Sequence, residues 1–168
     1  MMLSSKIKVL SFFTLITMIA VSCVNPPDYP DTPVIKYEGV NKTSVYQGAG
    51  GLPKDTLELF ISFTDGDGDL SFQDSTDIFL YNSKFPSIAS SFSIPSIPEE
   101  GTGNGIRGQI TIRIINNSNN ICCIANGIAC GSPATIDTDT FSYAIQIRDR
   151  SGHLSNRINT EVITVLCR

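Results

Sequence analysis

The chain contains no tryptophan, a single histidine and few charged residues. Charged residues make up 17% of the sequence, below the roughly 25% of an average soluble domain, which argues against a disordered acidic tail or a coiled coil. The one histidine, His153, stands in a turn beside Gly152, and no G-x-S-x-G motif supplies a nucleophile. Glycosidases normally need aromatic subsites, and the absence of tryptophan argues against that class. We therefore expect a protein that is not an enzyme.

Basic residues are few, which limits the possible partners. The chain has 12 Lys and Arg against 16 Asp and Glu, a net charge of −4 at pH 7. Two of the lysines lie in the first eight residues, so the rest of the chain is more acidic still. An acidic surface argues against nucleic-acid binding and against electrostatic adhesion to anionic lipid.

The first 22 residues have the pattern of an export signal. Two lysines precede an uncharged run over residues 9–21, which is too short for a bilayer-spanning helix of about 20 residues. Small residues then precede Cys23, as in the lipobox of bacterial lipoproteins, where the chain is cut before an acylated cysteine. We expect residues 1–22 to be a lipoprotein signal peptide and Cys23 to carry the lipid. The alternative is ordinary cleavage that leaves a free cysteine.

Residues 23–33 are expected to be a tether that begins at the lipidated cysteine. Four prolines and no periodicity are found in residues 24–33, a composition typical of an extended linker. The membrane is then reached through the lipid rather than through the protein surface.

The remaining sequence favours strands. It is rich in β-branched residues, and the whole chain has 22 Ile against 10 Leu and 7 Ala. Apolar and polar residues alternate in several segments, and no stretch keeps a helical period over eleven residues. We predict an all-β fold over residues 34–168, an antiparallel immunoglobulin-like β-sandwich of seven or eight strands, with a small barrel as the alternative. The predicted strands are Val34–Glu38, Thr43–Gln47, Thr56–Thr64, Asp77–Asn82, Ser91–Ile94, Ile106–Ile115, Phe141–Arg148 and Ile158–Cys167.

The predicted strand order places the connecting segments at two ends of the domain. Strands of such a sandwich run alternately up and down, so residues 65–76 and residues 149–157 should meet at one end. Residues 116–140 and the end of the last strand should meet at the other end. In the last strand, Ile158, Val162 and Leu166 are expected to share one face.

Four cysteines, Cys122, Cys123, Cys130 and Cys167, converge on the second of these ends. An even number in an exported domain predicts two disulfides. A bond between the adjacent Cys122 and Cys123 would require a strained ring, which leaves two arrangements open. Cys122–Cys130 can accompany Cys123–Cys167, or Cys123–Cys130 can accompany Cys122–Cys167. A zinc site of four thiolates is the alternative, although the Cys-Cys-x₆-Cys spacing lacks the usual C-x₂₋₄-C pairs.

Three aspartates, Asp65, Asp67 and Asp69, alternate with glycines at the first end. Ca²⁺ takes six to eight oxygen ligands, and glycine spacers allow neighbouring carboxylates to fold around one ion. Leu70 and Thr76 stand where an EF-hand needs Gly and Glu, so the loop is not an EF-hand. We predict a calcium site with further candidate ligands from both loops at this end; a solvated acidic turn is the alternative. Those further candidates are Asp74, Asp77 and Asp149.

Several short motifs together resemble a known group of proteins. The lipobox, the proline tether, FTDGDGDL at residues 63–70 and IRDRSGHLSN at residues 147–156 are similar to small uncharacterised lipoproteins of Bacteroidetes. The resemblance implies a single immunoglobulin- or cadherin-like β-sandwich. It also implies an outer-membrane location, facing the periplasm or the cell surface. No defined activity comes with it.

Two functional classes follow. The first is a lipid-anchored, calcium-stabilised binding or accessory module whose partner is a glycan or an outer-membrane protein. The second is a purely structural envelope lipoprotein with no small ligand or metal. Glycan binding predicts exposed rings, for which Tyr81, Phe85 and Phe92 are the candidates, whereas a structural role predicts that these rings are buried.

Overall fold

A computed structural model of the chain describes residues 28–48, 55–71, 76–87, 89–95, 105–116, 121–125, 128–129 and 136–167. All regular structure within these ranges is β, and none of it is helical. In the same part of the chain, no helix has the length and hydropathy that a membrane crossing requires. The predicted signal peptide and Cys23 lie outside the described residues.

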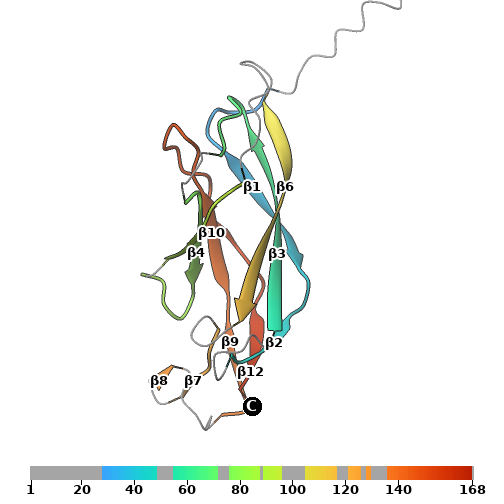
Figure 1. The fold of residues 1–168 in the computed structure, drawn as a ribbon, viewed down its shortest axis with the longest axis vertical. Helices are drawn as coiled ribbons and strands as arrows, with labels where there is room; N and C mark the ends of the chain where they lie inside the picture. The colour runs from blue at the N-terminus through green and yellow to red at the C-terminus, as the bar shows by residue number, and fades with distance from the viewer. Residues whose placement is uncertain are drawn as a thin grey trace, which may run out of the picture.

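One layer of the fold is a three-stranded antiparallel sheet with the order β1-β3-β6, which lies at the right in Figure 1. β3 and β6 pair over their full length, from Asp55 opposite Asn116 to Asp65 opposite Ile106. Because side chains of a strand alternate between faces, every second residue of β3 is buried, from Leu57 through to Asp65. The strands are β1 (Val34–Val40), β3 (Asp55–Asp65) and β6 (Ile106–Asn116).

The second layer contains two sheets that share one stretch of chain. The sheet orders are β11-β10-β4-β5 and β2-β12-β9, and only Ser142 separates β9 from β10. β2 pairs with β12 in parallel, and the other pairs in this layer are antiparallel. The strands are β2 (Ser44–Tyr46), β4 (Ile78–Asn82), β5 (Ala89–Phe92), β9 (Thr138–Phe141), β10 (Tyr143–Ile147), β11 (Ile158–Asn159) and β12 (Ile163–Leu166).

The hydrophobic core draws on both layers. β3 contributes Leu57, Leu59 and Ile61, which are completely buried, and the second layer contributes completely buried Ile145 and Ile163. Burial of apolar area of this kind is the main force that holds two sheets face to face. The prediction of an all-β fold with antiparallel sheets is confirmed, and the arrangement is consistent with a β-sandwich.

Two details differ from the predicted strands. The connection after β6 contains a small antiparallel pair of strands, β7 (Ile124–Ala125) and β8 (Ile128–Ala129). This pair was not predicted, because these short segments show no alternation of apolar and polar residues. The last predicted strand is split into β11 and β12, and Val162 between them is 63% exposed. The expectation that Val162 shares a buried face is therefore wrong.

The cause of this break is Thr160. Its Oγ1 accepts a hydrogen bond from the backbone N–H of Tyr143 and donates one to the carbonyl of Glu161. A side chain thus takes a backbone position in the ladder, as Thr can. The alternation starts again one residue later, so that Ile163 and Val165 face the core.

Candidate metal centre

The loop after β3 is fixed by the segment that leads into the domain. The carbonyl of Pro30 accepts a hydrogen bond of 2.8 Å from the backbone N–H of Gly66. A Cβ at Gly66 would lie 2.8 Å from the carbonyl carbon of Pro30 and still closer to the carbonyl oxygen of Tyr29, so only glycine allows this close approach. Gly68 has φ 71°, a left-handed conformation that turns the chain toward Asp69.

Asp65 is the last residue of β3 and continues its buried face. Its side chain is completely buried, and neither carboxylate oxygen has a hydrogen-bond partner among the described residues. Burial and, in smaller part, the charges of Asp67, Asp69 and Asp149 together raise the pKa of Asp65 to about 7. A buried carboxylate without partners is costly, so this position needs a compensating positive charge when Asp65 is ionised.

Asp69 fastens this loop to the loop that follows β10. Its Oδ2 accepts hydrogen bonds from the backbone N–H and the hydroxyl of Ser151, at 3.1 and 2.8 Å. Its backbone carbonyl accepts another from the N–H of Arg150, at 3.1 Å. The second carboxylate oxygen, Oδ1, is buried and has no hydrogen-bond partner in the described part of the chain. One oxygen therefore holds the loop, and the other is available to an ion.

Asp149 lies two residues after the end of β10, and it is 4% exposed. Its Oδ1 accepts a hydrogen bond from the N–H of His153 at 2.7 Å, and its Oδ2 lies 2.8 Å from Nδ1 of the same histidine. This hydrogen bond and the charge of Asp149 raise the pKa of His153. The turn from Asp149 to His153 is closed through the side chain of Asp149, which fixes the orientation of that carboxylate.

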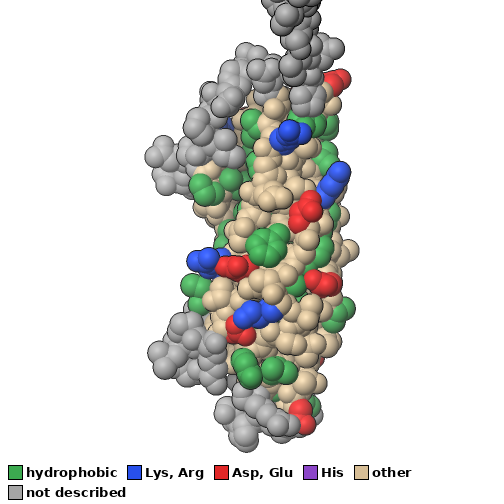
Figure 2. All heavy atoms as spheres, turned by 90° about the vertical axis from the view of Figure 1, so that its right-hand side faces the viewer, with side chains coloured by type: hydrophobic (Ala, Val, Ile, Leu, Met, Phe, Trp, Pro, Cys, Tyr) green, Lys and Arg blue, Asp and Glu red, His purple; other side chains and the backbone are tan. Residues whose placement is uncertain are grey.

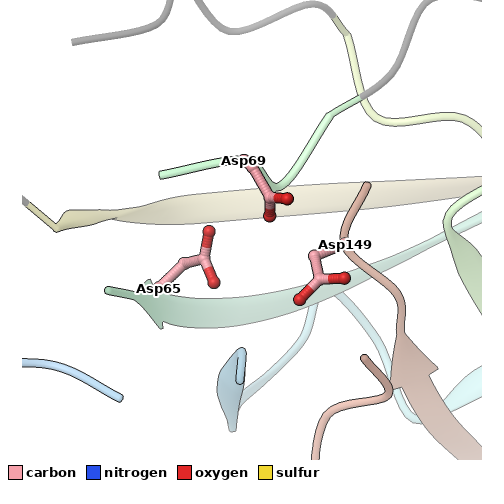
Figure 3. A group of neighbouring side chains, drawn as sticks. All are labelled: Asp65, Asp69 and Asp149. Atoms are coloured by element: carbon pink, nitrogen blue, oxygen red, sulfur yellow. The ribbon is translucent and has the colours of Figure 1, made fainter. Parts of the chain in front are cut away.

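The three carboxylates converge at one point. Asp65, Asp69 and Asp149 each offer an oxygen atom, and these atoms all lie within 4.8 Å of one another. Figure 3 shows the three side chains pointing toward a common space from the end of β3, the loop after it and the loop after β10. Carboxylate oxygens are the ligands that hard cations prefer. This group could hold a metal ion.

The other predicted ligands do not join this group. Asp67 is exposed. Partial desolvation of its carboxylate and the neighbouring charge of Asp69 raise its pKa. Asp77 is buried, but its carboxylate does not belong to the group whose oxygens all lie within 4.8 Å of one another. Asp74 lies outside the described residues. Of the six aspartates predicted as ligands, the structure brings three together.

The supporting residues of the site were not predicted from the sequence. Ser151 and His153 contact the carboxylates directly, and the imidazole side chain remains 48% exposed. The i, i+4 spacing of Asp149 and His153 was the available signal. The predicted meeting of the loops after β3 and after β10 is confirmed by the hydrogen bonds between Asp69 and the 150–151 segment.

The opposite end of the domain carries the disulfide. Cys123 and Cys167 are bonded, with Cα atoms 5.8 Å apart, and both are buried. This link belongs to the first of the two predicted arrangements. Cys122 is also disulfide-bonded, whereas Cys130 lies outside the described residues. Cysteines held in disulfides cannot form the alternative thiolate zinc site.

The three rings named as glycan contacts do not share one environment. Phe85 is 43% exposed, and Phe92 packs against the core. The guanidinium of Arg157 lies 3.9 Å from the ring centroid of Tyr81 and covers it. Of the three, only Phe85 is an exposed ring, so these residues do not make the flat aromatic surface expected for glycan stacking.

Comparisons with known proteins add no family to these observations. No protein-family model matches the sequence, and neither the curated proteins nor the solved structures give a match. The function is therefore argued from the site.

Proposed function

We propose that this protein is a lipid-anchored envelope module, an immunoglobulin-like β-sandwich that binds Ca²⁺ at Asp65, Asp69 and Asp149. The observation that carries the proposal is Asp65, a completely buried carboxylate with no hydrogen-bond partner in the described part of the chain, aimed at two further carboxylates. Calcium suits a site made only of oxygen donors from three backbone positions, because it accepts flexible geometry and fills its remaining positions with water or carbonyl oxygens.

A calcium ion at this point would connect the two layers of the domain. Asp65 ends a strand of the β1-β3-β6 sheet, and Asp149 follows β10 of the opposite layer. Three carboxylates within 4.8 Å repel one another without a cation. The ion replaces this repulsion by attraction between the layers, so calcium binding should appear as increased stability.

The strand order supports the immunoglobulin-like topology. The β1-β3-β6 sheet corresponds to strands A, B and E, and the β11-β10-β4-β5 sheet corresponds to G, F, C and C′. β2, which pairs in parallel with β12, takes the place of A′ beside G.

The anchor is inferred from the sequence, and its orientation follows if Cys23 carries the lipid. The described chain enters the domain through Tyr29 and Pro30, which lie against the metal loop. Four residues lie between Cys23 and Asp28, so the five steps of chain from one to the other reach at most roughly 18 Å. A lipid on Cys23 therefore holds the metal end close to the outer membrane, and the disulfide end extends away from it.

A thermal melt tests the metal site. The oxidised protein is melted with excess calcium and again with chelator; calcium at 100 times its dissociation constant adds roughly 2.7 kcal/mol to the free energy of unfolding. We expect a clear rise in Tm that Asp65→Asn abolishes. The matched control is Asp67→Asn in the same loop, which is exposed and outside the triad. Coincident melts with and without calcium would contradict the proposal and favour the purely structural alternative.

A further inference from the structure

A groove with a volume of about 720 Å³ lies on the outer face of the β1-β3-β6 sheet, next to the segment that enters the domain. Its floor is formed by outward-facing residues of the three strands, and Tyr29 and Pro30 form one wall. This size is that of a site for a small ligand. Figure 2 shows the side of the molecule on which this sheet lies, where hydrophobic side chains form separate islands among polar ones.

Two basic side chains of the groove, Lys36 and Arg107, stand out by their lack of partners. They are the only cations in the described part of the chain with no acidic, carbonyl or aromatic partner. No Asp or Glu lines the groove, although the chain as a whole has a net charge of −4. The cations elsewhere have partners: Lys42, Lys84 and Arg113 pair with acids, Arg148 and Arg157 lie over rings, and Arg150 bonds a carbonyl.

Glu38 is two residues from Lys36 on β1, and no ion pair joins these two described side chains. Glu38 lies on the same face of β1 as Lys36, but its Oε1 accepts a hydrogen bond from the hydroxyl of Ser62 at 2.5 Å. Glu38 keeps its charge but is not among the residues that line the groove, so the two basic side chains can contact a ligand there.

The strand register sets the spacing of the two charges. Lys36 pairs with Ser62 on β3, and Arg107 pairs with Thr64 from the other side of β3. Their backbones are separated by two strand spacings and by two residues along the strand, roughly 12 Å in all, so the two side chains can reach two separate acidic groups of one extended ligand. Thr64 lies on β3 between the two strands that carry them, and Gln109 lies beside Arg107 on β6. The hydroxyl of Thr64 and the amide of Gln109 line the groove and are groups that bond sugar hydroxyls.

We propose that this groove binds an acidic oligosaccharide, with Lys36 and Arg107 each pairing with a carboxylate or sulfate group. Thr64 and Gln109 bond hydroxyls of the sugar, and the ring of Tyr29 and the side chain of Val34 cover its apolar faces. This inference names a ligand class for the binding module of the proposed function and rests on that role. It uses none of the three metal carboxylates.

Calorimetry measures the binding of sugar and anion probes to the full-length protein, which is solubilised in detergent and kept in buffer with calcium. The probes are a trigalacturonate, a sulfated chondroitin disaccharide, a neutral galactose trisaccharide and inorganic sulfate. We expect at least one acidic sugar to bind saturably, the neutral sugar and sulfate to bind at least tenfold more weakly than it does, and affinity to fall with added salt. Lys36→Gln and Arg107→Gln should each weaken binding about fivefold.

The matched control is Arg113→Gln, which removes the same charge from the same face of β6 at a residue already paired with Glu58. It should change affinity less than twofold. Three results would overturn the inference: neither acidic sugar binds, inorganic sulfate binds as tightly as the sugars, or Arg113→Gln weakens binding as much as Lys36→Gln. The calcium-dependent melt is recorded on the same samples, so loss of sugar binding with an intact calcium response rejects the groove alone.

Discussion

The carboxylate of Asp69 accepts two hydrogen bonds from Ser151, one from the backbone N–H and one from the hydroxyl, at 3.1 and 2.8 Å. These bonds join the loop after β3 to the loop after β10 without any ion. The second oxygen of Asp69 stays buried beside Asp65 and Asp149. The hydrogen bonds from Ser151 thus hold the carboxylate of Asp69 in place before any cation binds. Less ordering is then required when a cation arrives.

Ser151→Ala should weaken this preorganisation. The substitution removes the hydroxyl donor and keeps the backbone donor, so we expect a loss of about 1 kcal/mol in the free energy of unfolding with calcium present. The apparent affinity for calcium should fall severalfold, because Asp69 becomes less well oriented. Calcium titrations followed by Tm measure both effects. An unchanged affinity would show that Ser151 does not position Asp69.

The pH dependence of stability should reverse between metal-free and calcium-bound protein. The folded-state pKa of Asp65 is raised to about 7 from an ordinary value of 3.8. Protonation of Asp65 therefore favours the folded state, so its contribution is fully present below about pH 4 and is lost as the pH rises through 7. In chelator we expect the protein to be about 1–2 kcal/mol more stable at pH 5.5 than at pH 8.

With excess calcium the opposite order is expected, since only the deprotonated carboxylates bind the ion. Asp65→Asn separates this effect from the titration of His153, whose raised pKa acts in the same direction. In chelator at pH 8 this variant should be at least as stable as the wild type, and its stability should change less with pH. A wild-type protein that is most stable at pH 8 in chelator would contradict the account.

Gly66→Ala tests the contact between the entering segment and the metal loop. A Cβ at this position would lie 2.8 Å from the backbone carbon and oxygen of Pro30, and backbone atoms cannot move away cheaply. We expect a loss of about 1–3 kcal/mol in the free energy of unfolding, as for other overpacked sites. Proteolysis should then cut near residues 28–33 more readily than in the wild type. Asp67→Ala in the same exposed turn is the control; it should leave the proteolysis unchanged and should not lower the free energy of unfolding.

The disulfide end should stabilise the fold without affecting the metal. Joining Cys123 to Cys167 closes a segment with a sequence separation of 44, for which the chain-entropy treatment gives about 4 kcal/mol. We expect the double substitution Cys123→Ala and Cys167→Ala to lower the Tm strongly, by an amount that corresponds to about 2–4 kcal/mol. Calcium affinity at a temperature where the variant is folded should stay within twofold of the wild type. A large fall in affinity would show that the two ends are coupled.

Much of the fold could be predicted because half-buried strands show an alternation of apolar and polar residues. The alternation from Leu57 to Phe63 predicted β3. The order of the predicted strands placed the Asp65–Asp69 loop and Asp149 at the same end of the domain, where the structure has them. The alternation even includes Asp65, which is in phase with the buried residues of β3. This phase is the signal that separates Asp65 from Asp67, which follows the end of the strand and is exposed.

Other features depend on contacts that no local pattern contains. The shift at Thr160 arises because a hydroxyl replaces a backbone group in the pairing of β10. The contact of Tyr29 with Gly66 joins residues more than thirty positions apart. The groove with Lys36 and Arg107 depends on the register across three strands, which places these two side chains on the same face of the sheet.

The most direct test of the account is a calorimetric titration of metal-stripped protein with calcium at pH 8. The account predicts one calcium site, complete loss of binding in Asp65→Asn, and near wild-type affinity in Asp67→Asn. Calcium binding that survives Asp65→Asn, or a wild-type protein that takes up no calcium, would contradict the assignment of Asp65, Asp69 and Asp149 as a calcium centre.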